Sequence, residues 1–324
     1  MPDLQQPWLE TYSPDASLLD IFHCFRLILG RNPHAEEWTG HSMLAGTPLA
    51  PVVTSYLRSL EFANRGLLAP QAQGEVVGTE LPGFQIFSAA TDGAVGRHVR
   101  DNNYELDVTA VFRRVLRPGM AVLDIGANIG YFTMLSAALV GPGGHVLAIE
   151  PNPLNARLLE ASRQANGFGH VTVAQVAAAA ELGLLVLHTS HSTGTTSALG
   201  GSVAAVLAAE TVPAIPPDRL VTRPIDLIKI DVDGSEYHAL RGCEATIRRD
   251  RPLIVSEFAP GLLPGLSGVS GEQYLRWLGG LGYTVSVIEP DGSLAPMGQD
   301  WAAVLAMHER RGTDHIDILA SPIR

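Results

Sequence analysis

The stretch Val122–Tyr131, VLDIGANIGY, decides the fold of this 324-residue chain. An apolar run ends at Asp124, small and turn-prone residues follow, and an apolar helical pattern begins directly after Gly130. This order predicts a strand, a tight turn and a helix. The glycines leave the space above the strand end free of side chains, so a nucleotide-like ligand can lie against the backbone at the helix N-terminus.

A second apolar run, 145–149, ends in Glu150 and Pro151, twenty residues after Gly130. In a strand-turn-helix unit of this kind, a carboxylate at the end of the second strand can accept hydrogen bonds from both hydroxyls of a ribose. The two strand ends together therefore predict a site for a cofactor that contains adenosine.

The spacing of the turn indicates which cofactor this is. Nicotinamide and flavin sites usually carry G-x-G-x-x-G, because the backbone must approach a pyrophosphate closely. Here the order is Asp124-x-Gly126-x-Asn128-x-Gly130. A carboxylate in the turn would repel a pyrophosphate but suits the amino and sulfonium groups of S-adenosylmethionine. We therefore expect S-adenosylmethionine, with a nicotinamide-dependent oxidoreductase as the alternative.

Longer segments resemble the FkbM-type class I methyltransferases. The segment Arg117–Thr133, RPGMAVLDIGANIGYFT, is similar to the first motif of that family, and Glu150–Pro153, EPNP, to its second. The segment Leu227–Glu236, LIKIDVDGSE, with LRGC at 240–243, resembles its third signature. The likeness covers about residues 92–324. It implies methyl transfer from S-adenosylmethionine to a hydroxyl oxygen, often of a sugar or a natural product, and leaves the acceptor open.

The resemblance also implies roles for single positions. It adds Tyr131 and Pro151 to the cofactor site, places Glu105 near the methyl donor, and sets the adenine against the small side chains around Ala178. The chain departs from the family at Val176, where a polar residue is usual, and at Asp233, where glutamate is commoner.

The densest acidic cluster, Asp231, Asp233 and Glu236, stands where a predicted strand ends and a helix begins. Asp231 is a candidate for the general base or for a contact to the methionine part of the cofactor. Asp233 and Glu236 are candidates for binding an acceptor hydroxyl, with helix capping as their structural alternative. Paired carboxylates also suit magnesium or calcium, but we expect no metal here.

Three further residues complete the catalytic candidates beside Asp231. Lys229 is the only lysine in the chain, and an ammonium inside an apolar strand needs a partner, which the site carboxylates can supply. A side chain that extends to solvent from the strand end is the alternative. Glu257, at the end of the next strand, is a second candidate base, and His238 a third.

The segment 188–197, HTSHSTGTTS, is polar and rich in hydroxyls, and it interrupts the pattern of strands. We expect a lid or an acceptor-binding loop there, with His191 as an acceptor contact. A plain surface loop is the alternative.

The chain divides into a helical module at 1–68, a linker at 69–91 rich in Ala, Gln, Gly and Pro, and a catalytic domain at 92–324. Helical spacing predicts helices from 15 to Gly30, from 36 to 45 and from 49 to 62. The module resembles a short helical repeat domain found beside bacterial surface-glycan enzymes and adhesins. Docking or homo-oligomerisation through these helices and simple packing on the catalytic domain both remain open.

After the linker, strands and helices alternate, which predicts an α/β fold with a doubly wound, Rossmann-like sheet. The expected seven strands are 121–125, 145–149, 170–174, 226–231, 252–257, 283–288 and 315–320, with helices near 130–140, 152–166, 235–249, 271–281 and 300–311. The resemblance implies that the last strand runs antiparallel between its neighbours.

The amino-acid composition limits the possible partners and cellular locations of the protein. The formal charge of −11 argues against a nucleic-acid partner and favours a neutral or cationic acceptor. No apolar run is long enough to cross a bilayer, and residues 1–10 have no secretion-signal pattern. The two cysteines, Cys24 and Cys243, fit buried thiols in a reducing compartment, so we expect a cytoplasmic protein. A catalytically inert scaffold for a glycan-assembly complex is a third hypothesis.

Overall fold

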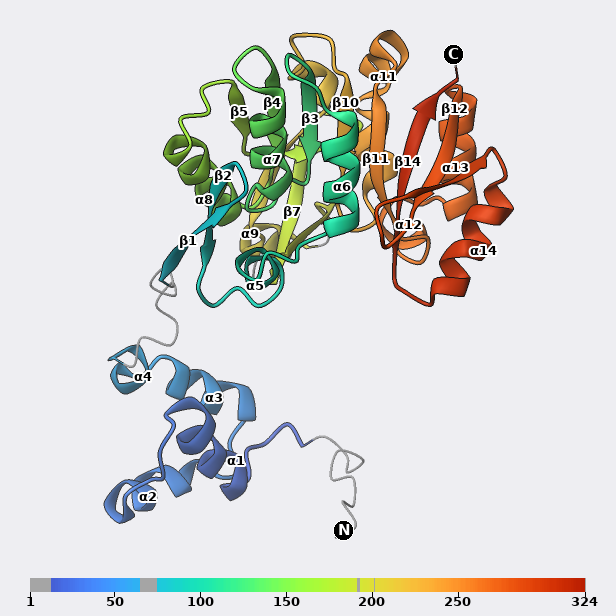
Figure 1. Cartoon of the computed structure of the whole chain (residues 1–324). Helices are drawn as coiled ribbons and strands as arrows, with labels where there is room; N and C mark the ends of the chain where they lie inside the picture. The colour runs from blue at the N-terminus through green and yellow to red at the C-terminus, as the bar shows by residue number, and fades with distance from the viewer. Residues whose placement is uncertain (1–12, 65–74, 191–192, 201, 324) are drawn as a thin grey trace. The chain divides into compact units, whose positions relative to one another are not determined.

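The structure is a computed structural model that describes residues 13–64, 75–190, 193–200 and 202–323. The chain forms two compact units, Met1–Gly74 and Glu75–Arg324 (Figure 1). The boundary therefore falls inside the predicted linker 69–91. Its last part belongs to the larger unit, and residues 69–74 lie outside the described residues.

The smaller unit is helical, as predicted. Its elements are α1 (Leu18–His23), the π-helix η2 (Cys24–Ile28), α2 (Ala35–His41), the 3-10 helix η3 (Ser42–Leu44), α3 (Leu49–Leu57) and α4 (Leu60–Asn64). The first helical stretch ends at Gly30, whose φ of 62° is left-handed. Ile21, Phe25 and Leu29, spaced by four residues, form the core with Val52 and Tyr56.

One arginine ties the helices of this unit together. Arg31 donates to both carboxylate oxygens of Glu37, at 2.8 Å each, and to both of Glu61, at 2.5 and 2.7 Å. Its guanidinium also lies 5.2 Å from the ring centre of Phe25. Planar bidentate pairing of this kind is specific to arginine. This pairing joins the segment near Arg31 to the segment near Glu61. These are two of the segments on which the resemblance of this module is based.

The larger unit contains a sheet of eight strands in the order β13-β12-β14-β11-β10-β3-β4-β5 (Figure 1). Their bounds are β3 (Ala121–Ile125), β4 (His145–Ile149), β5 (Val171–Ala174), β10 (Leu227–Ile230), β11 (Leu253–Phe258), β12 (Tyr283–Ile288), β13 (Leu294–Gly298) and β14 (Ile316–Pro322). The strands from β11 to β5 are parallel, and β14 runs antiparallel between β11 and β12, as expected. The predicted count of seven was wrong, because β13 adds an edge strand.

Helices cover both faces of this sheet. On one face α5 (Val95–Arg100), α6 (Leu106–Val115), α7 (Tyr131–Val140) and α8 (Pro153–Ala165) pack against Val122 and the residues in register with it. On the other face α10 (Glu236–Arg241), α11 (Glu244–Asp250), α12 (Leu263–Leu266), α13 (Gly271–Gly280) and α14 (Trp301–Arg311) pack against Leu123 and its neighbours. Burial on both faces explains the continuous apolar strands. The single helix predicted for 235–249 is two helices.

A hairpin not predicted from the sequence occupies the end of the predicted linker. Strands β1 (Val76–Leu81) and β2 (Phe84–Ala89) pair antiparallel. The Asn166 side chain, at the end of α8, accepts from the Gln85 amide at 2.8 Å and donates to its carbonyl at 2.6 Å. Phe84 and Ile86 enter the core. The linker prediction was therefore wrong for residues 76–89.

A second sheet lies beside the first. It contains β6 (Ala177–Ala178), β9 (Thr211–Ile215), β7 (Gly183–Ser190) and β8 (Thr193–Ala198), in that order, with α9 (Val203–Ala208) before β9. The segment 188–197 was expected to be a loop, but its described residues belong to the β7–β8 hairpin. Its predicted acceptor contact, His191, lies outside the described residues.

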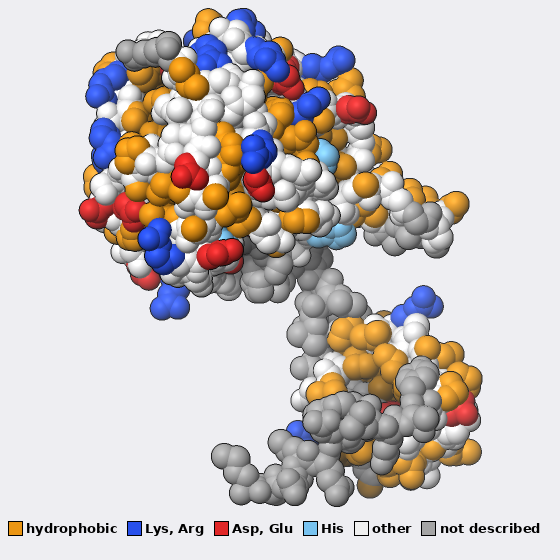
Figure 2. Space-filling view, turned by 90° about the vertical axis from the view of Figure 1, so that its right-hand side faces the viewer, with side chains coloured by type: hydrophobic (Ala, Val, Ile, Leu, Met, Phe, Trp, Pro, Cys, Tyr) orange, Lys and Arg blue, Asp and Glu red, His pale blue; other side chains and the backbone are white. Residues whose placement is uncertain are grey.

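None of the described helices has the length and apolar character needed to span a bilayer. Cys24 and Cys243 are buried free thiols, as predicted. On the face seen in Figure 2, arginine side chains of the larger unit are spread among acidic and apolar ones.

Candidate functional site

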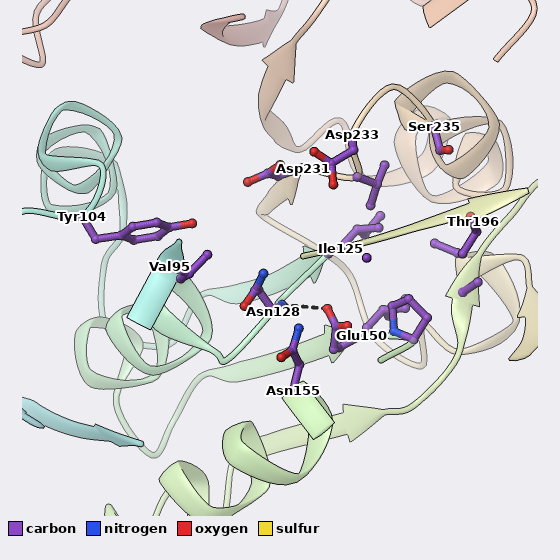
Figure 3. Close-up of a pocket in the computed structure, with 17 residues that line it drawn as sticks. Val95, Tyr104, Ile125, Asn128, Glu150, Asn155, Thr196, Asp231, Asp233 and Ser235 are labelled. Carbon is purple, nitrogen blue, oxygen red and sulfur yellow. Dashed lines mark hydrogen bonds between the residues drawn. The ribbon is translucent and has the colours of Figure 1, made fainter. Parts of the chain in front are cut away.

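A pocket of about 190 Å³ opens beyond the carboxyl ends of the parallel strands, where such sheets bind their ligands (Figure 3). Residues from the three turns after β3, β4 and β10 line it: Gly126 and Asn128, Glu150 and Pro151, and Asp231 to Asp233. Tyr104 closes one side, and Ala177, Ala178, Gly194 and Thr196 close another. The predicted cofactor and acceptor residues are thus largely brought together.

The turn after β3 is tightly packed. Gly126 has a φ of 79°, and a Cβ atom there would lie 1.8 Å from the Asp231 carbonyl oxygen. Gly130 has a φ of 97°, and a Cβ would lie 2.7 Å from Cγ of Leu159. Each glycine is therefore required for both conformation and space. Three of the five non-glycine residues with positive φ in the described chain, Glu105, Asn128 and Asp233, lie around this pocket.

Glu150 forms the floor of the pocket. Its Oε2 accepts from the Asn128 amide and its Oε1 from the Asn152 amide, both at 2.8 Å (Figure 3). Burial raises the pKa of Glu150 to about 7, although these backbone hydrogen bonds oppose the shift. Asn155, on α8, also lines the pocket and hydrogen-bonds Glu150. Sequence reasoning missed Asn155, because a polar residue on a helix gives no signal until the strand end beside it is placed.

Asp124 does not lie where the electrostatic argument put it. The side chain is 1% exposed, and its Oδ2 accepts from the Thr133 hydroxyl at 2.5 Å. It borders only a small cavity that adjoins the main pocket, together with Lys229 and Tyr131. Burial raises the pKa of Asp124, while Lys229 opposes the shift. The Asp124 carboxylate therefore does not line the pocket itself. It affects the pocket only through the residues that lie between the two.

Lys229 is the cation at the centre of the acidic cluster. Its Nζ donates to Asp231 Oδ2 at 2.9 Å and lies 4.7 Å from the ring centre of Phe132. Burial alone would lower the pKa of Lys229, but Asp231, Glu105 and Asp124 outweigh it and raise the pKa. The side chain is only 5% exposed, so the alternative of a solvent-reaching lysine is wrong. A permanently charged, paired ammonium cannot act as a base.

Asp231 and Glu257 differ in protonation. Burial would raise the pKa of Asp231, but Lys229 and a hydrogen bond with Glu257 bring it below its ordinary value. Burial, followed by repulsion from Asp231, raises the pKa of Glu257 to about 10. At neutral pH Asp231 therefore presents a carboxylate to the pocket, whereas Glu257 is a neutral acid and does not line the pocket, contrary to the expectation that it faces the same crevice. Of the two candidate bases, only Asp231 can accept a proton there.

Of the other two acidic candidates, Asp233 lines the pocket and Glu236 stabilises the turn after β10. Asp233 lines the pocket, and burial together with Asp231 raises its pKa. Glu236 is 1% exposed, and its Oε1 accepts from the amides of Val232 and Gly234 at 3.1 and 3.0 Å. Glu236 therefore closes the turn after β10, which is its capping alternative, and is absent from the pocket lining.

His238 is exposed and borders a neighbouring hollow formed around Ala178–Leu185, not the main pocket. Glu105 begins α6 with a φ of 38° and is half-buried, and burial raises its pKa. Its neighbour Tyr104 reaches the pocket instead (Figure 3). Tyr131 packs against Tyr104 at 5.2 Å between ring centres, so it supports the wall of the pocket without lining it.

Ala178 and Pro151 line the pocket as the resemblance implied. Thr196, from the β7–β8 hairpin, was not singled out, although it lies in the hydroxyl-rich segment 188–197. Among the residues that the structure describes, no three His, Cys, Asp or Glu side chains are grouped so that they could hold a metal ion.

Comparisons with known proteins find methyltransferases. A family profile described as "Methyltransferase FkbM domain" matches residues 124–285, half of the chain. Over 43 residues the chain is 46% identical to ribosomal RNA large subunit methyltransferase E of Sorangium cellulosum, covering 13% of this chain and 20% of that protein. Over 55 residues it is 44% identical to protein-L-isoaspartate O-methyltransferase of Methanothrix thermoacetophila, covering 16% and 26%. The chain thus spans only a fifth to a quarter of these curated relatives.

Solved structures also resemble it. A methyltransferase FkbM from Methylobacillus flagellatus KT has 13% identity and a TM-score of 0.40, covering 92% of this chain and 58% of that chain. An O-methyltransferase from Bacillus cereus in complex with SAH has 13% identity and a TM-score of 0.39, covering 67% and 80%. The family profile contains the turns after β3, β4 and β10 that build the pocket, and it shows that the chain belongs to the FkbM methyltransferase family, with a class I methyltransferase domain.

Proposed function

We propose that this protein is an S-adenosylmethionine-dependent O-methyltransferase that acts on a hydroxyl of a sugar, a glycan or a natural product. The observation that carries the proposal is the convergence of Gly126, Glu150 and Asp231 on one pocket at the carboxyl edge of the sheet. It combines bare backbone, a buried ribose-binding carboxylate and an ionised aspartate within the matched family region.

The residues present fit the cofactor. Glu150 is placed to accept the ribose hydroxyls, and the small side chains of Ala177 and Ala178, with Pro151, leave room for a flat ring. The negative charge of Asp231 and the aromatic ring of Tyr104 suit a sulfonium. When bound, S-adenosylmethionine supplies an activated methyl group.

The protein has two tasks in such a reaction. Holding the donor and the hydroxyl in line can lower the barrier by about 7 to 11 kcal/mol. A placed base contributes about 10² to 10⁴-fold. Asp231 is the base that the protonation states favour, and Asp233 is placed to hold the acceptor. Loss of the base should therefore leave measurable activity, whereas loss of the cofactor pocket should not.

Calorimetry with S-adenosylhomocysteine tests the cofactor. Binding is expected, and no heat at millimolar ligand would remove the proposal. A fluorescence titration with NADH separates it from a nicotinamide-dependent oxidoreductase. Transfer of labelled methyl groups to p-nitrophenyl glycosides and simple phenols then tests for an acceptor hydroxyl, and turnover with any of them removes the inert-scaffold hypothesis.

We make further proposals about the charge of the acceptor, the cellular location of the protein and the role of the smaller unit. We propose a neutral or cationic acceptor and no nucleic-acid partner, because the net charge is −11 and the arginines in Figure 2 are interspersed with acidic side chains. The buried free thiols support a cytoplasmic protein. We also propose that the helices of the smaller unit serve docking or homo-oligomerisation, because Leu27, Met43 and Leu60 are each about 80% exposed there.

A further inference from the structure

We propose that Asp231, Glu257 and His315 form a proton path that carries the acceptor's hydroxyl proton from the pocket to solvent. The inference rests on the proposed O-methyl transfer and goes beyond it, because it assigns a route to the proton that the reaction must release.

The three residues lie in or directly beside three adjacent strands of the sheet: Asp231 follows β10, Glu257 is in β11, and His315 precedes β14. Ile230 pairs with Ser256 in the parallel β10–β11 ladder, so Asp231 and Glu257, the next residues, lie side by side. Phe258 pairs with Ile316 in the antiparallel β11–β14 ladder, which brings His315 to the same edge. His315 Nδ1 lies 3.3 Å from Glu257 Oε1.

Glu257 is the most buried member of this line. The side chain of Asp231, which faces the pocket, is 27% exposed, that of Glu257 is 15% exposed, and that of His315 is 43% exposed. The path therefore leads in two steps from the pocket, through Glu257, to the surface. His315 Nδ1 also lies 2.9 Å from Oδ1 of Asp314, whose side chain is 88% exposed.

The surroundings of Glu257, the middle residue of the path, favour a proton on its carboxyl group. Glu257 Oε2 is buried and finds no donor among the described residues. A carboxyl in that position gains a hydrogen bond only if it carries a proton itself and donates it to the neighbouring Asp231. The path thus begins with a carboxylate at Asp231, a neutral acid at Glu257 and an imidazole at the surface.

The surrounding charges maintain this arrangement. Four carboxyl groups repel a negative charge on Glu257: Asp231 and Asp233 in the turn after β10, Glu236 at the start of α10, and Asp317 in β14. Lys229 stays paired with Asp231 and keeps its proton. His315 is the basic side chain in contact with Glu257 on the side away from the pocket.

The step balances as follows. The hydroxyl oxygen forms a bond to the methyl carbon while the carbon–sulfur bond breaks, and that electron pair stays on sulfur, which becomes neutral. The hydroxyl proton passes to Asp231. The Glu257 carboxyl then rotates so that its proton faces the His315 imidazole and gives up that proton, accepts the proton of Asp231 on its other oxygen, and His315 releases one proton to water. One proton enters at the pocket and one leaves at the surface.

Infrared spectroscopy of the full chain tests the resting state without any acceptor. At about pH 8.5 Glu150 is largely ionised and Glu257 largely neutral, so a carboxylic-acid carbonyl band is expected that loses intensity in Glu257→Gln, while Asp317, whose pKa burial also raises, keeps its own contribution. Glu272→Gln, on the exposed surface of α13, is the matched control and should keep the band. A spectrum unchanged by Glu257→Gln overturns the path.

Steady-state kinetics tests whether the proton leaves through His315. The substrate is whichever p-nitrophenyl glycoside the protein methylates. His315→Asn should lower kcat about tenfold or more with KM and S-adenosylhomocysteine affinity unchanged, and added imidazole should restore kcat. His308→Asn is the control, because His308 Nε2 holds the same loop through the Asp314 carbonyl at 3.2 Å but does not touch Glu257. A full kcat in His315→Asn, or a loss that imidazole does not restore, overturns the path. Absence of S-adenosylhomocysteine binding overturns instead the proposed function.

Discussion

Gly126 controls the shape of the pocket most directly. In Gly126→Ala the new Cβ would overlap the Asp231 carbonyl, 1.8 Å away, in a backbone conformation that alanine disfavours. The strand ends must then separate, and calorimetry should show S-adenosylhomocysteine affinity lowered at least a hundredfold. Gly143→Ala, where the added atom meets nothing within 4 Å, should bind normally. Wild-type affinity in Gly126→Ala would show that the turn does not contact the cofactor.

Glu150 makes binding depend on pH. Its pKa of about 7 is raised mainly by burial, so the carboxylate that we propose binds the two ribose hydroxyls forms only as pH rises through 7. S-adenosylhomocysteine affinity should therefore increase between pH 6 and pH 8, by up to about tenfold. Calorimetry across this range measures it. Glu150→Gln should bind weakly and without this slope, whereas Glu236→Gln, which removes a group with a similar pKa outside the pocket, should keep it.

At the residue scale, sequence reasoning found the groups that backbone geometry dictates. Gly126, Glu150 and Asp231 follow from strand ends and spacing, and they line the pocket. It could not predict which carboxylate turns inward, because side-chain direction depends on partners such as Thr133 for Asp124. For the same reason Glu236 was left between acceptor binding and capping until its backbone donors were known.

At the scale of elements, the β1–β2 hairpin is held to α8 by the side chains of Ser162 and Asn166. Asn166→Ala removes both hydrogen bonds to the Gln85 backbone and leaves the amide and carbonyl of this half-buried residue without these partners. The free energy of unfolding should fall by about 1 to 3 kcal/mol. Urea unfolding of the full chain measures this. Gln164→Ala, two residues earlier, removes only a surface hydrogen bond to Glu160 and should have little effect.

Arg31 has the corresponding role in the smaller unit. Lysine cannot bind two carboxylates in the bidentate manner of Arg31, so Arg31→Lys should lower the unfolding temperature of that unit in calorimetry of the full chain. The hydrogen bond from Arg31 lowers the pKa of Glu37 to about 2. Its stabilising effect is present above the ordinary glutamate pKa and is lost as pH falls towards 2. Arg58→Lys, on an exposed position, should change neither property.

The central strands were predicted almost to the residue, because burial on both faces leaves continuous apolar runs that few other structures produce. The hairpins were missed for the opposite reason. Strand β1 alternates exposed and half-buried residues, and β8 is a polar run, so neither shows the apolar signal. Their pairing is set by contacts with α8 and β9, which a single local sequence does not contain.

At the scale of the whole molecule, the pocket belongs to one unit. All its lining residues fall between Val95 and Ser235, within Glu75–Arg324. A chain of residues 75–324 should therefore bind S-adenosylhomocysteine with the affinity of the full chain, as calorimetry can check. If that shorter chain folds, shown by its circular dichroism, but does not bind, the helical unit must complete the site.

The buried ion pair of Lys229 also affects how the protein can be handled. The chain has no other lysine, and this one is 4% exposed and charged. Amine-reactive dyes, cross-linkers and coupling resins require a reachable, uncharged amine, so on the folded chain they should attach only at the α-amino terminus. Unfolding adds one more reactive amine. The ratio of dye to protein therefore counts denatured molecules in a preparation.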